Sequence, residues 1–303
     1  MENAKISKIQ QLKKEKNAVI LAHFYTSDEI QQVADYVGDS YYLAKVAKEI
    51  EQDTIVFAGV SFMGESAKVL NPQKKVLMPD LTADCAMAHM VKEGIIDEMR
   101  AKYSDLAVVC YVNSSIELKC QSDVCVTSSN AVKIVKNLPN KNIFFIPDEN
   151  LGRFVSEKVP EKNIILNDGY CPIHKAMTLK HLRQAKEKYP NALVLTHPES
   201  IKKVVDLSDF VGSTAEIIEY AKNSDRQQFI ICTEIGVLCK LKKDNPNKQF
   251  YFVDPRPVCV DMKKNTLDGI INVLESGANE IIIDSEKIER ALKPLDMMLQ
   301  LAK

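Results

Sequence analysis

The chain has 303 residues, a formal net charge of −1 and 46% hydrophobic residues, which is long enough for two or three small domains or one large one. Without an excess of basic side chains to neutralise phosphates, nucleic acid is not an expected partner. No apolar run approaches the ~18 residues of a membrane helix, and the N-terminus lacks the apolar segment of a signal peptide. We therefore expect no membrane association and a cytoplasmic location, where the eight cysteines should be thiols, metal ligands or catalytic groups.

Short runs rich in Val and Ile alternate along the chain with helical patterns, and such runs predict buried strands. In chain order the predicted strands are AVILAHF (18–24), TIVFAG (54–59), KKVLMPD (74–80), LAVVCYV (106–112), NIFFIPD (142–148), NIILND (163–168), ALVLTHP (192–198), QFIICTE (228–234) and QFYFVD (249–254). They fall into three sets of three.

The turns, helix-ending prolines and loops between these strands recur at nearly constant spacing. Turns with small hydroxyl residues open helices at Ser40, Ser128 and Ser213, which are 88 and 85 positions apart. Prolines that stop a later helix stand at Pro72, Pro160 and Pro246, 88 and 86 apart. A loop after the third strand of each set ends in Cys85, Cys171 and Cys259, 86 and 88 apart. The spacing indicates three copies of one unit.

Each copy is predicted to run helix–strand–helix–strand–helix–strand–Cys, which is typical of an α/β fold with a short parallel sheet covered by helices. The predicted domains are 1–85, 86–171 and 172–259, followed by a C-terminal helical segment at 260–303. Ligands of such sheets bind beyond the carboxyl ends of the strands. A pseudo-threefold arrangement would point these three rims at one central cavity.

The cysteines that end the three loops are the strongest functional signal. Cysteine is often only a small buried hydrophobe, and we expect that role for Cys110 and Cys232, which lie inside apolar runs. Three thiolates in equivalent loops are instead suited to zinc or an iron–sulfur cluster. A metal with only three protein ligands keeps one position open for water or substrate.

Other polar residues fall on the same predicted rims. Glu199 follows a proline in a loop, where a semi-enclosed carboxylate is expected to have a raised pKa. Tyr111 could equally pack in the core as a strand residue. The other rim residues are His23, Tyr25, Asn113, His174 and His197.

The hydroxyl turns at 38–40, 127–128 and 212–214 are by default helix caps. Three of them in register also predict three anion sites, since helix amino ends attract phosphate and carboxylate. The expected ligand is small and carries several negative charges.

Several longer motifs resemble one family. They are HFY (23–25), DYVGDS (35–40), FMGESAKVLNP (62–72), YVN (111–113), DVCVTSSNA (123–131), PDENLG (147–152), GYCPIH (169–174), THPE (196–199), GSTAEI (212–217) and TEIGVL (233–238). Together they look like the quinolinate synthase family, over nearly the whole chain.

The resemblance implies three Rossmann-like αβα domains around a pseudo-threefold axis. It implies condensation of iminoaspartate with dihydroxyacetone phosphate to quinolinate, with release of phosphate and two waters, in NAD biosynthesis. It also implies an oxygen-sensitive [4Fe–4S] cluster with one open iron, held by Cys85, Cys171 and Cys259. A functional link to an enzyme that produces iminoaspartate follows from the same resemblance.

The resemblance also assigns roles to individual residues. Glu199 would be the main acid/base, assisted by Tyr25 and His23, and Tyr111 and Asn113 would contact substrate near the open iron. The remaining substrate-binding residues would be Ser40, Met63, Ser128, His174, His197, Ser213 and Thr214.

Two alternatives stay open at this point. One is a zinc-dependent hydrolase or aldolase that uses the same three cysteines. The other is a non-catalytic module that closes its domains on an anionic metabolite.

Overall fold

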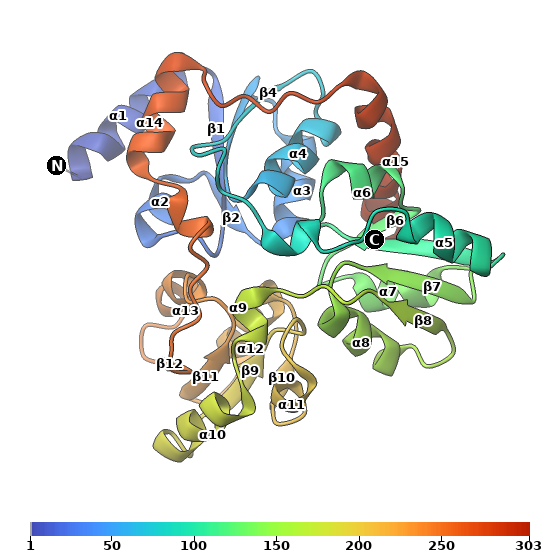
Figure 1. The fold of residues 1–303 in the computed structure, drawn as a ribbon. Coiled ribbons are helices and arrows are strands. Elements are labelled where there is room, and N and C mark those ends of the chain that lie inside the picture. Colours follow the sequence, from blue (N-terminus) through green and yellow to red (C-terminus); the bar gives the residue numbers. More distant parts are fainter. Residues whose placement is uncertain (1) are drawn as a thin grey trace. The chain divides into compact units, whose positions relative to one another are not determined.

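The computed structural model of the protein describes residues 2–303 (Figure 1), which form an α/β fold with three four-stranded sheets. The strand orders are β2-β1-β3-β4, β6-β5-β7-β8 and β10-β9-β11-β12, and the paired strands run parallel. Each sheet is flanked by helices, so the predicted fold of three Rossmann-like sheets is confirmed. The arrangement of all three around one cavity stays a prediction.

All nine predicted strands are present. They are β1 (Ala18–His23), β3 (Thr54–Ala58), β4 (Lys75–Leu77), β5 (Leu106–Tyr111), β7 (Asn142–Ile146), β8 (Asn163–Leu166), β9 (Leu193–Thr196), β11 (Gln228–Cys232) and β12 (Gln249–Phe252). The first strand of each set lies second in its sheet, with the second strand of the set beside it. This order brings the carboxyl ends of neighbouring strands to one edge.

The fourth strand of each sheet was not predicted. These edge strands are β2 (Tyr36–Gly38), β6 (Val124–Val126) and β10 (Phe210–Val211). An aspartate precedes each of them, at Asp35, Asp123 and Asp209. The first and the last accept a backbone N–H from the adjacent strand: Ile20 N donates to Asp35 over 2.8 Å, and Val194 N donates to Asp209 over 2.7 Å. The recurring segments DYVGDS, DVCVTS and DFVGST were the signal that could have predicted these strands.

Helices connect the strands. The α-helices are α1 (Glu2–Glu15), α2 (Asp28–Val33), α3 (Ser40–Glu49), α4 (Ser61–Leu70), α5 (Ile95–Lys102), α6 (Ile116–Cys120), α7 (Ala131–Asn137), α8 (Glu149–Lys158), α9 (Pro172–Lys175), α10 (Leu179–Lys188), α11 (Lys202–Val205), α12 (Thr214–Asn223), α13 (Val237–Asp244), α14 (Leu267–Ser276) and α15 (Ser285–Leu301). Two 3₁₀-helices are η1 (Ala86–His89) and η2 (Met262–Lys264). No helix among residues 2–303 has both the length and the apolar composition to cross a membrane.

The chain divides into two compact units. Unit 1 contains Met1–His89, Val112–Thr127 and Val260–Lys303, and unit 2 contains Met90–Tyr111 and Ser128–Cys259. The predicted domain boundaries at 85, 171 and 259 are not tested by this division and stay a prediction.

In unit 1, α1 and α14 pack together on one face of the first sheet, while α3 and α4 lie on the other (Figure 1). The core between α1, α14 and the sheet includes fully buried Ile9, Ile20 and Ile270. Each such side chain stabilises the fold by roughly 1.5–3 kcal/mol. The long helix α15 packs on α4 and α6.

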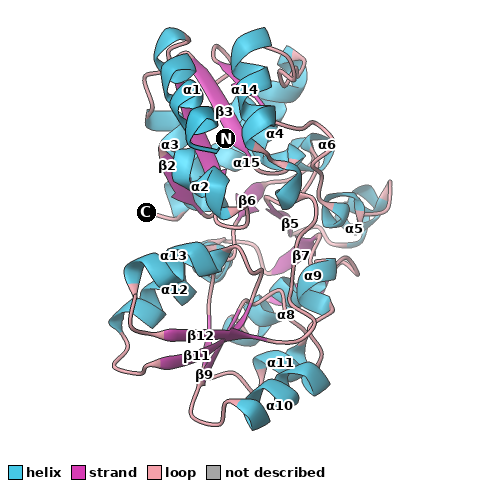
Figure 2. Cartoon of the chain, turned by 90° about the vertical axis from the view of Figure 1, so that its left-hand side faces the viewer, coloured by secondary structure: helices cyan, strands magenta, loops and turns pink. Residues whose placement is uncertain are grey.

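In unit 2, the third sheet lies between α12 and α13 on one face and α10 and α11 on the other (Figure 2). The core on one face of this sheet is built by Leu182, Val194 and Ile230, all fully buried. The near-continuous apolar strands follow from burial on both faces. Polar residues such as His197 and Thr233 follow these strands in the loops at their carboxyl ends.

Candidate functional site

Each of the three cysteines predicted as metal ligands lies in the loop that follows the last strand of its set. Cys85 lies in unit 1 after β4, and Cys171 and Cys259 lie in unit 2 after β8 and β12. All three are half-buried and form no disulfide bond with another described residue. Each is therefore accessible enough to bind a ligand and has no disulfide partner to block it.

The backbone holds the three loops in the same way. Ser61 N donates to Ala83 O over 2.8 Å in the first loop, and Glu149 N donates to Gly169 O over 2.8 Å in the second. In the third, Ile235 N donates to Pro257 O over 2.9 Å. In every case the acceptor stands two positions before the cysteine, so the three loops are structurally equivalent.

Gly169 is needed in the second loop for close packing. A Cβ atom at this position would lie 2.6 Å from Pro147 O, closer than real Cβ atoms approach a backbone oxygen. The glycine of the sequence GYC at 169–171 therefore lets the loop pack against the residue that follows β7, and this contact places Cys171 two positions further along the loop.

The most concentrated polar group of unit 2 centres on Glu199. Its Oε2 lies 2.7 Å from Nδ1 of His174, and the same nitrogen lies 3.2 Å from Sγ of Cys171. Nε2 of His174 lies 2.9 Å from Oγ1 of Thr233, and Tyr111 hydrogen-bonds the Glu199 carboxylate. His174 and Glu199 are 1% and 3% exposed, so their polar contacts are made almost without water.

His197 completes this group, and its neighbours fix its tautomer. Glu199 N donates to Nδ1 of His197 over 3.3 Å, so Nδ1 carries no proton. The proton then belongs on Nε2, which lies 3.2 Å from Oγ of Ser128. The ring stacks on that of His174 with centroids 4.7 Å apart. We call these residues the buried polar cluster: Tyr111, Ser128, Cys171, His174, His197, Glu199 and Thr233.

The protonation of the buried polar cluster follows from burial and pairing. Burial lowers the pKa of His197 from 6.5 to about 3, in agreement with an Nδ1 that only accepts. Burial alone would raise the pKa of Glu199, but the two histidines and the hydrogen bonds from His174 and Tyr111 outweigh it and lower that pKa to about 2. Because His197 is neutral near pH 7, the main stabilising groups there are His174 and Tyr111. The expected raised pKa of Glu199 was therefore wrong.

A buried acid adjoins this cluster. Burial raises the pKa of Asp148 well above its ordinary value, the charge of Glu199 acts in the same direction, and backbone N–H groups oppose both. Neither Asp148 nor Thr233 was singled out from the sequence. Asp148 stands two residues after β7 and Thr233 directly after β11, and that position was the available signal.

The structure places the other predicted residues in unit 1. His23 ends β1, its Nδ1 accepts Tyr25 N over 3.1 Å, and the two rings meet edge to face at 4.5 Å. Ser40 and Met63 line one small apolar cavity. Asn113 has a buried Oδ1 without a hydrogen-bond partner among the described residues, as expected of an atom that meets a ligand.

The predicted hydroxyl turns are only partly at helix amino ends. Helix α3 begins at Ser40 but is capped by Asp39, whose side chain accepts Tyr42 N. Helix α7 begins at Ala131, so Thr127 and Ser128 precede it in a loop, contrary to the prediction. Helix α12, like α3, begins as predicted, at Thr214 with the buried Ser213 as its cap.

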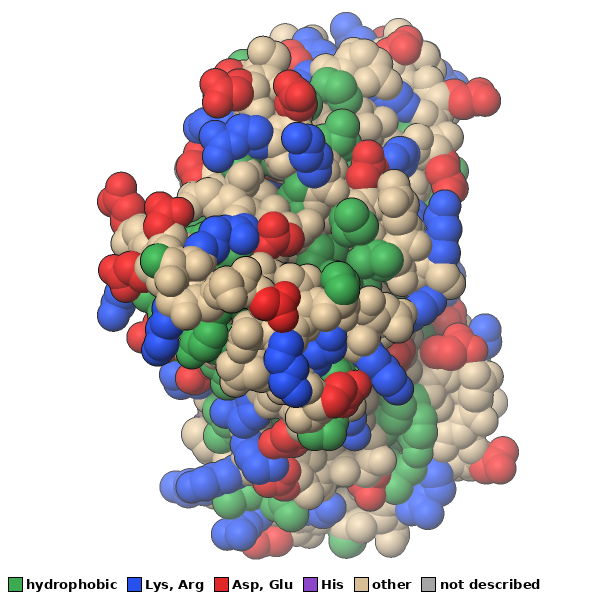
Figure 3. Space-filling view, turned by 90° about the vertical axis from the view of Figure 1, so that its right-hand side faces the viewer, with side chains coloured by type: hydrophobic (Ala, Val, Ile, Leu, Met, Phe, Trp, Pro, Cys, Tyr) green, Lys and Arg blue, Asp and Glu red, His purple; other side chains and the backbone are tan. Residues whose placement is uncertain are grey.

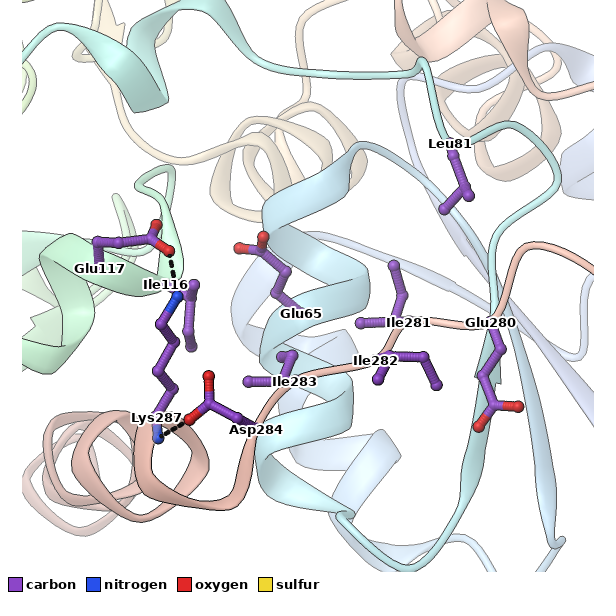
Figure 4. Close-up of a pocket in the computed structure, with 10 residues that line it drawn as sticks. All are labelled: Glu65, Leu81, Ile116, Glu117, Glu280, Ile281, Ile282, Ile283, Asp284 and Lys287. Atoms are coloured by element: carbon purple, nitrogen blue, oxygen red, sulfur yellow. Dashed lines mark hydrogen bonds and ion pairs between the residues drawn. The ribbon is translucent and has the colours of Figure 1, made fainter.

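A cavity of about 430 Å³ opens elsewhere on unit 1 (Figure 4). Its lining pairs Glu117 with Lys287 over 2.9 Å. Burial raises the pKa of Glu65, Lys119 opposes this rise, and Glu117 adds to it. The sequence analysis assigned no role to this cavity. On the face drawn in Figure 3, acidic and basic side chains are interspersed.

The donors of the buried polar cluster can also hold a metal ion. Sγ of Cys171, a ring nitrogen of His174 and a carboxylate oxygen of Glu199 lie within 4.8 Å of one another. A soft thiolate beside an imidazole and a carboxylate suits zinc or iron.

The fold is α/β with three sheets of parallel strands, and in unit 2 the loops of two of these sheets present a half-buried cysteine beside a buried acid and two buried histidines. A family model described as quinolinate synthetase A protein matches residues 7–300. The quinolinate synthase of Caldicellulosiruptor saccharolyticus is 52% identical over 294 residues, covering 97% of both chains. That of Clostridioides difficile is 51% identical over 294 residues, with the same coverage. The chain belongs to the quinolinate synthase family.

Proposed function

We propose that the protein is a quinolinate synthase of NAD biosynthesis. It condenses iminoaspartate with dihydroxyacetone phosphate and forms quinolinate, phosphate and two waters. The observation that carries this proposal is the Glu199 carboxylate, which is 3% exposed and joined to both His174 and Tyr111 beside the thiol of Cys171. The reaction needs proton transfers at carbon and oxygen, and this group offers an ionised acceptor next to two donors.

The cysteines fit a [4Fe–4S] cluster as its protein ligands. Cys85, Cys171 and Cys259 lie in three equivalent loops and form no disulfide among the described residues, and soft thiolates are the usual ligands of such clusters. When bound by three cysteines, the cluster supplies a Lewis acid with one open iron. Family membership supports the same assignment.

The chain's own residues would supply the proton transfers. Glu199 is ionised near pH 7 and accepts a proton from substrate, while His174 keeps it oriented through the 2.7 Å contact. Nε2 of His174 lies 2.9 Å from the Thr233 hydroxyl, which offers a route for the proton away from the carboxylate. Tyr111 hydrogen-bonds the same carboxylate. In unit 1, Tyr25 and His23 assist as the resemblance implies.

Binding the substrates requires groups for carboxylate and phosphate. The Ser128 hydroxyl and the buried His197 lie together in unit 2, and Asn113 offers an unpaired buried oxygen in unit 1. Exclusion of water from the buried polar cluster would protect the imine from hydrolysis. Since iminoaspartate hydrolyses readily, the proposal implies a functional link to an enzyme that produces it.

The test is Glu199→Gln, with Glu187→Gln on the exposed side of α10 as control. Glutamine keeps the size of the side chain but cannot accept a proton, so phosphate release from the two substrates should fall by about 10²–10⁴-fold. Binding of quinolinate should change little. Unchanged phosphate release in Glu199→Gln would remove Glu199 from the mechanism. A wild-type protein that binds quinolinate but shows no turnover would favour a binding module.

A second candidate is a zinc enzyme, favoured by the donor set of Cys171, His174 and Glu199 within 4.8 Å. Anaerobic elemental analysis separates the two. The cluster proposal expects about four irons and brown colour, while one zinc per chain and no visible absorption would support the second candidate.

A further inference from the structure

A carboxylate accepts the backbone N–H of each of the three cysteines. Cys171 N donates to Oδ2 of Asp148 and Cys259 N donates to Oε1 of Glu234, both over 3.1 Å. In the first loop, Cys85 N donates to Oδ1 of Asp84 over 2.7 Å. No catalytic step proposed above uses any of these three acids.

The two acids of unit 2 occupy equivalent positions. Asp148 stands two residues after β7, and Glu234 stands two residues after β11. The residue after each acid donates its N–H to the loop that carries the cysteine. The equivalent position in the first repeat is Val60, and there the carboxylate comes from Asp84, which also accepts the hydroxyl of Ser61.

Asp148 and Glu234 each use their two oxygens on different parts of the chain. Oδ1 of Asp148 accepts Leu151 N over 2.6 Å at the start of α8, while Oδ2 accepts Cys171 N. Oε2 of Glu234 accepts Gly236 N over 2.5 Å before α13, while Oε1 accepts Cys259 N. An amide side chain cannot replace this fork, because only one of its two polar atoms accepts.

Burial makes these bridges rigid. Asp148 and Glu234 are both 0% exposed, and a hydrogen bond is stronger where water does not compete for its donor and acceptor. The carboxylates therefore connect each cysteine backbone to the start of a helix. Groups of this kind orient the ligands of metal sites, and their loss typically costs 10–100-fold in metal affinity.

We propose that Asp148 and Glu234 are positioning residues, which hold the loops of Cys171 and Cys259 so that both thiolates are ready to bind a metal cluster. The proposal rests on the proposed function for the identity of the cluster. The positioning itself belongs to the protein without metal.

The test variants are Asp148→Asn and Glu234→Gln, which keep the side-chain size but lose one acceptor oxygen. Asp168→Asn is the control, because Asp168 is exposed and stands three positions before Cys171. In the metal-free full chain, hydrogen exchange of the peptides that contain Cys171 or Cys259 should accelerate about tenfold in the respective variant and stay unchanged in the control. Equal exchange in wild type and both variants would overturn the proposal.

In the anaerobically reconstituted protein, a chelator should remove iron about tenfold faster from each variant than from wild type or the control, followed by the loss of visible absorption. Glu234→Asp, which keeps two acceptor oxygens, should release iron more slowly than Glu234→Gln. Equal release rates for these two would contradict positioning by the carboxylate fork. If wild type takes up no iron, the cluster proposal fails instead, and the exchange measurement still decides the positioning role.

Discussion

The imidazole of His197 is kept neutral by its surroundings. Its Nδ1 accepts the backbone N–H of Glu199, and its Nε2 faces the Ser128 hydroxyl. The titratable groups nearest to it are Glu199, which favours the charged ring, and His174, which opposes it. Burial dominates, so the pKa in the folded state is about 3, below the ordinary value of 6.5.

A depressed pKa makes stability depend on pH in a defined direction. The unfolded chain binds a proton at His197 below about pH 6.5, whereas the folded chain binds it only near pH 3. The contribution of His197 is fully present above pH 6.5 and falls by about 1.4 kcal/mol for each pH unit below it. His197→Asn keeps an acceptor near the Nδ1 position but cannot be protonated. Its free energy of unfolding in urea should therefore fall less steeply between pH 6.5 and 4.5 than that of wild type, and equal slopes would contradict this account.

A repeat or a motif marked several single residues in the sequence. Cys171, His174 and Glu199 were predicted to lie on the rims of the repeats, and the structure brings these three together. The lowered pKa of Glu199 was not foreseeable, because it depends on which histidine nitrogen faces the carboxylate. Thr233 has no sequence signal beyond its place after a strand.

At the scale of elements, helix caps decide what the hydroxyl turns do. Ser213 caps α12 in a reciprocal box: its Oγ accepts Glu216 N over 3.3 Å, and the Glu216 carboxylate accepts Ser213 N over 2.7 Å. The helix amino end is thus partly satisfied by the protein itself. Ser27 precedes α2 in the same position, but its side chain makes no cap hydrogen bond.

Replacing each of these two serines tests whether the cap hydrogen bond, rather than a serine at the start of a helix, stabilises the protein. Ser213→Ala should lower the free energy of unfolding by about 1 kcal/mol without any ligand, because the Glu216 N–H loses its acceptor. Ser27→Ala should cost little, since the buried Ser27 hydroxyl has no partner among the described residues to lose. Urea unfolding at pH 7.5 measures both. Equal losses for the two variants would show that Ser213 has no special capping role.

The strands illustrate why elements are predicted unevenly. Seven of the nine predicted runs hold four or more consecutive apolar residues, which distinguishes them from their surroundings. Strands β2, β6 and β10 have only two or three residues each, too few to show a period. Their position is instead fixed by pairing with the neighbouring strand and, at Asp35 and Asp209, by the acceptor that precedes them.

For the whole molecule, sequence repeats and compact units are different divisions. The spacing of landmarks predicts three copies, and three similar sheets are present. Packing, however, assigns α6 and β6 of the second copy to unit 1, where they contact α15. A contact between segments more than 150 positions apart leaves no local pattern, so it could not be predicted from spacing.

The three equivalent cysteine loops concern the whole molecule, because one cluster would need a thiolate from every copy of the repeat. Cys85→Ala, Cys171→Ala and Cys259→Ala should each reduce iron from about four to less than about one per chain after anaerobic reconstitution. Cys239→Ala is the control, because Cys239 is also a half-buried cysteine outside any disulfide of the described residues, but it lies on α13 of unit 2, away from the three loops. Iron and acid-labile sulfide analysis gives the stoichiometry, and thermal unfolding of the metal-free variants checks that each is folded. If a folded Cys85→Ala, Cys171→Ala or Cys259→Ala variant retains four irons, the replaced cysteine is not a cluster ligand. Loss of iron in Cys239→Ala would show that the ligand set is not confined to the three loops.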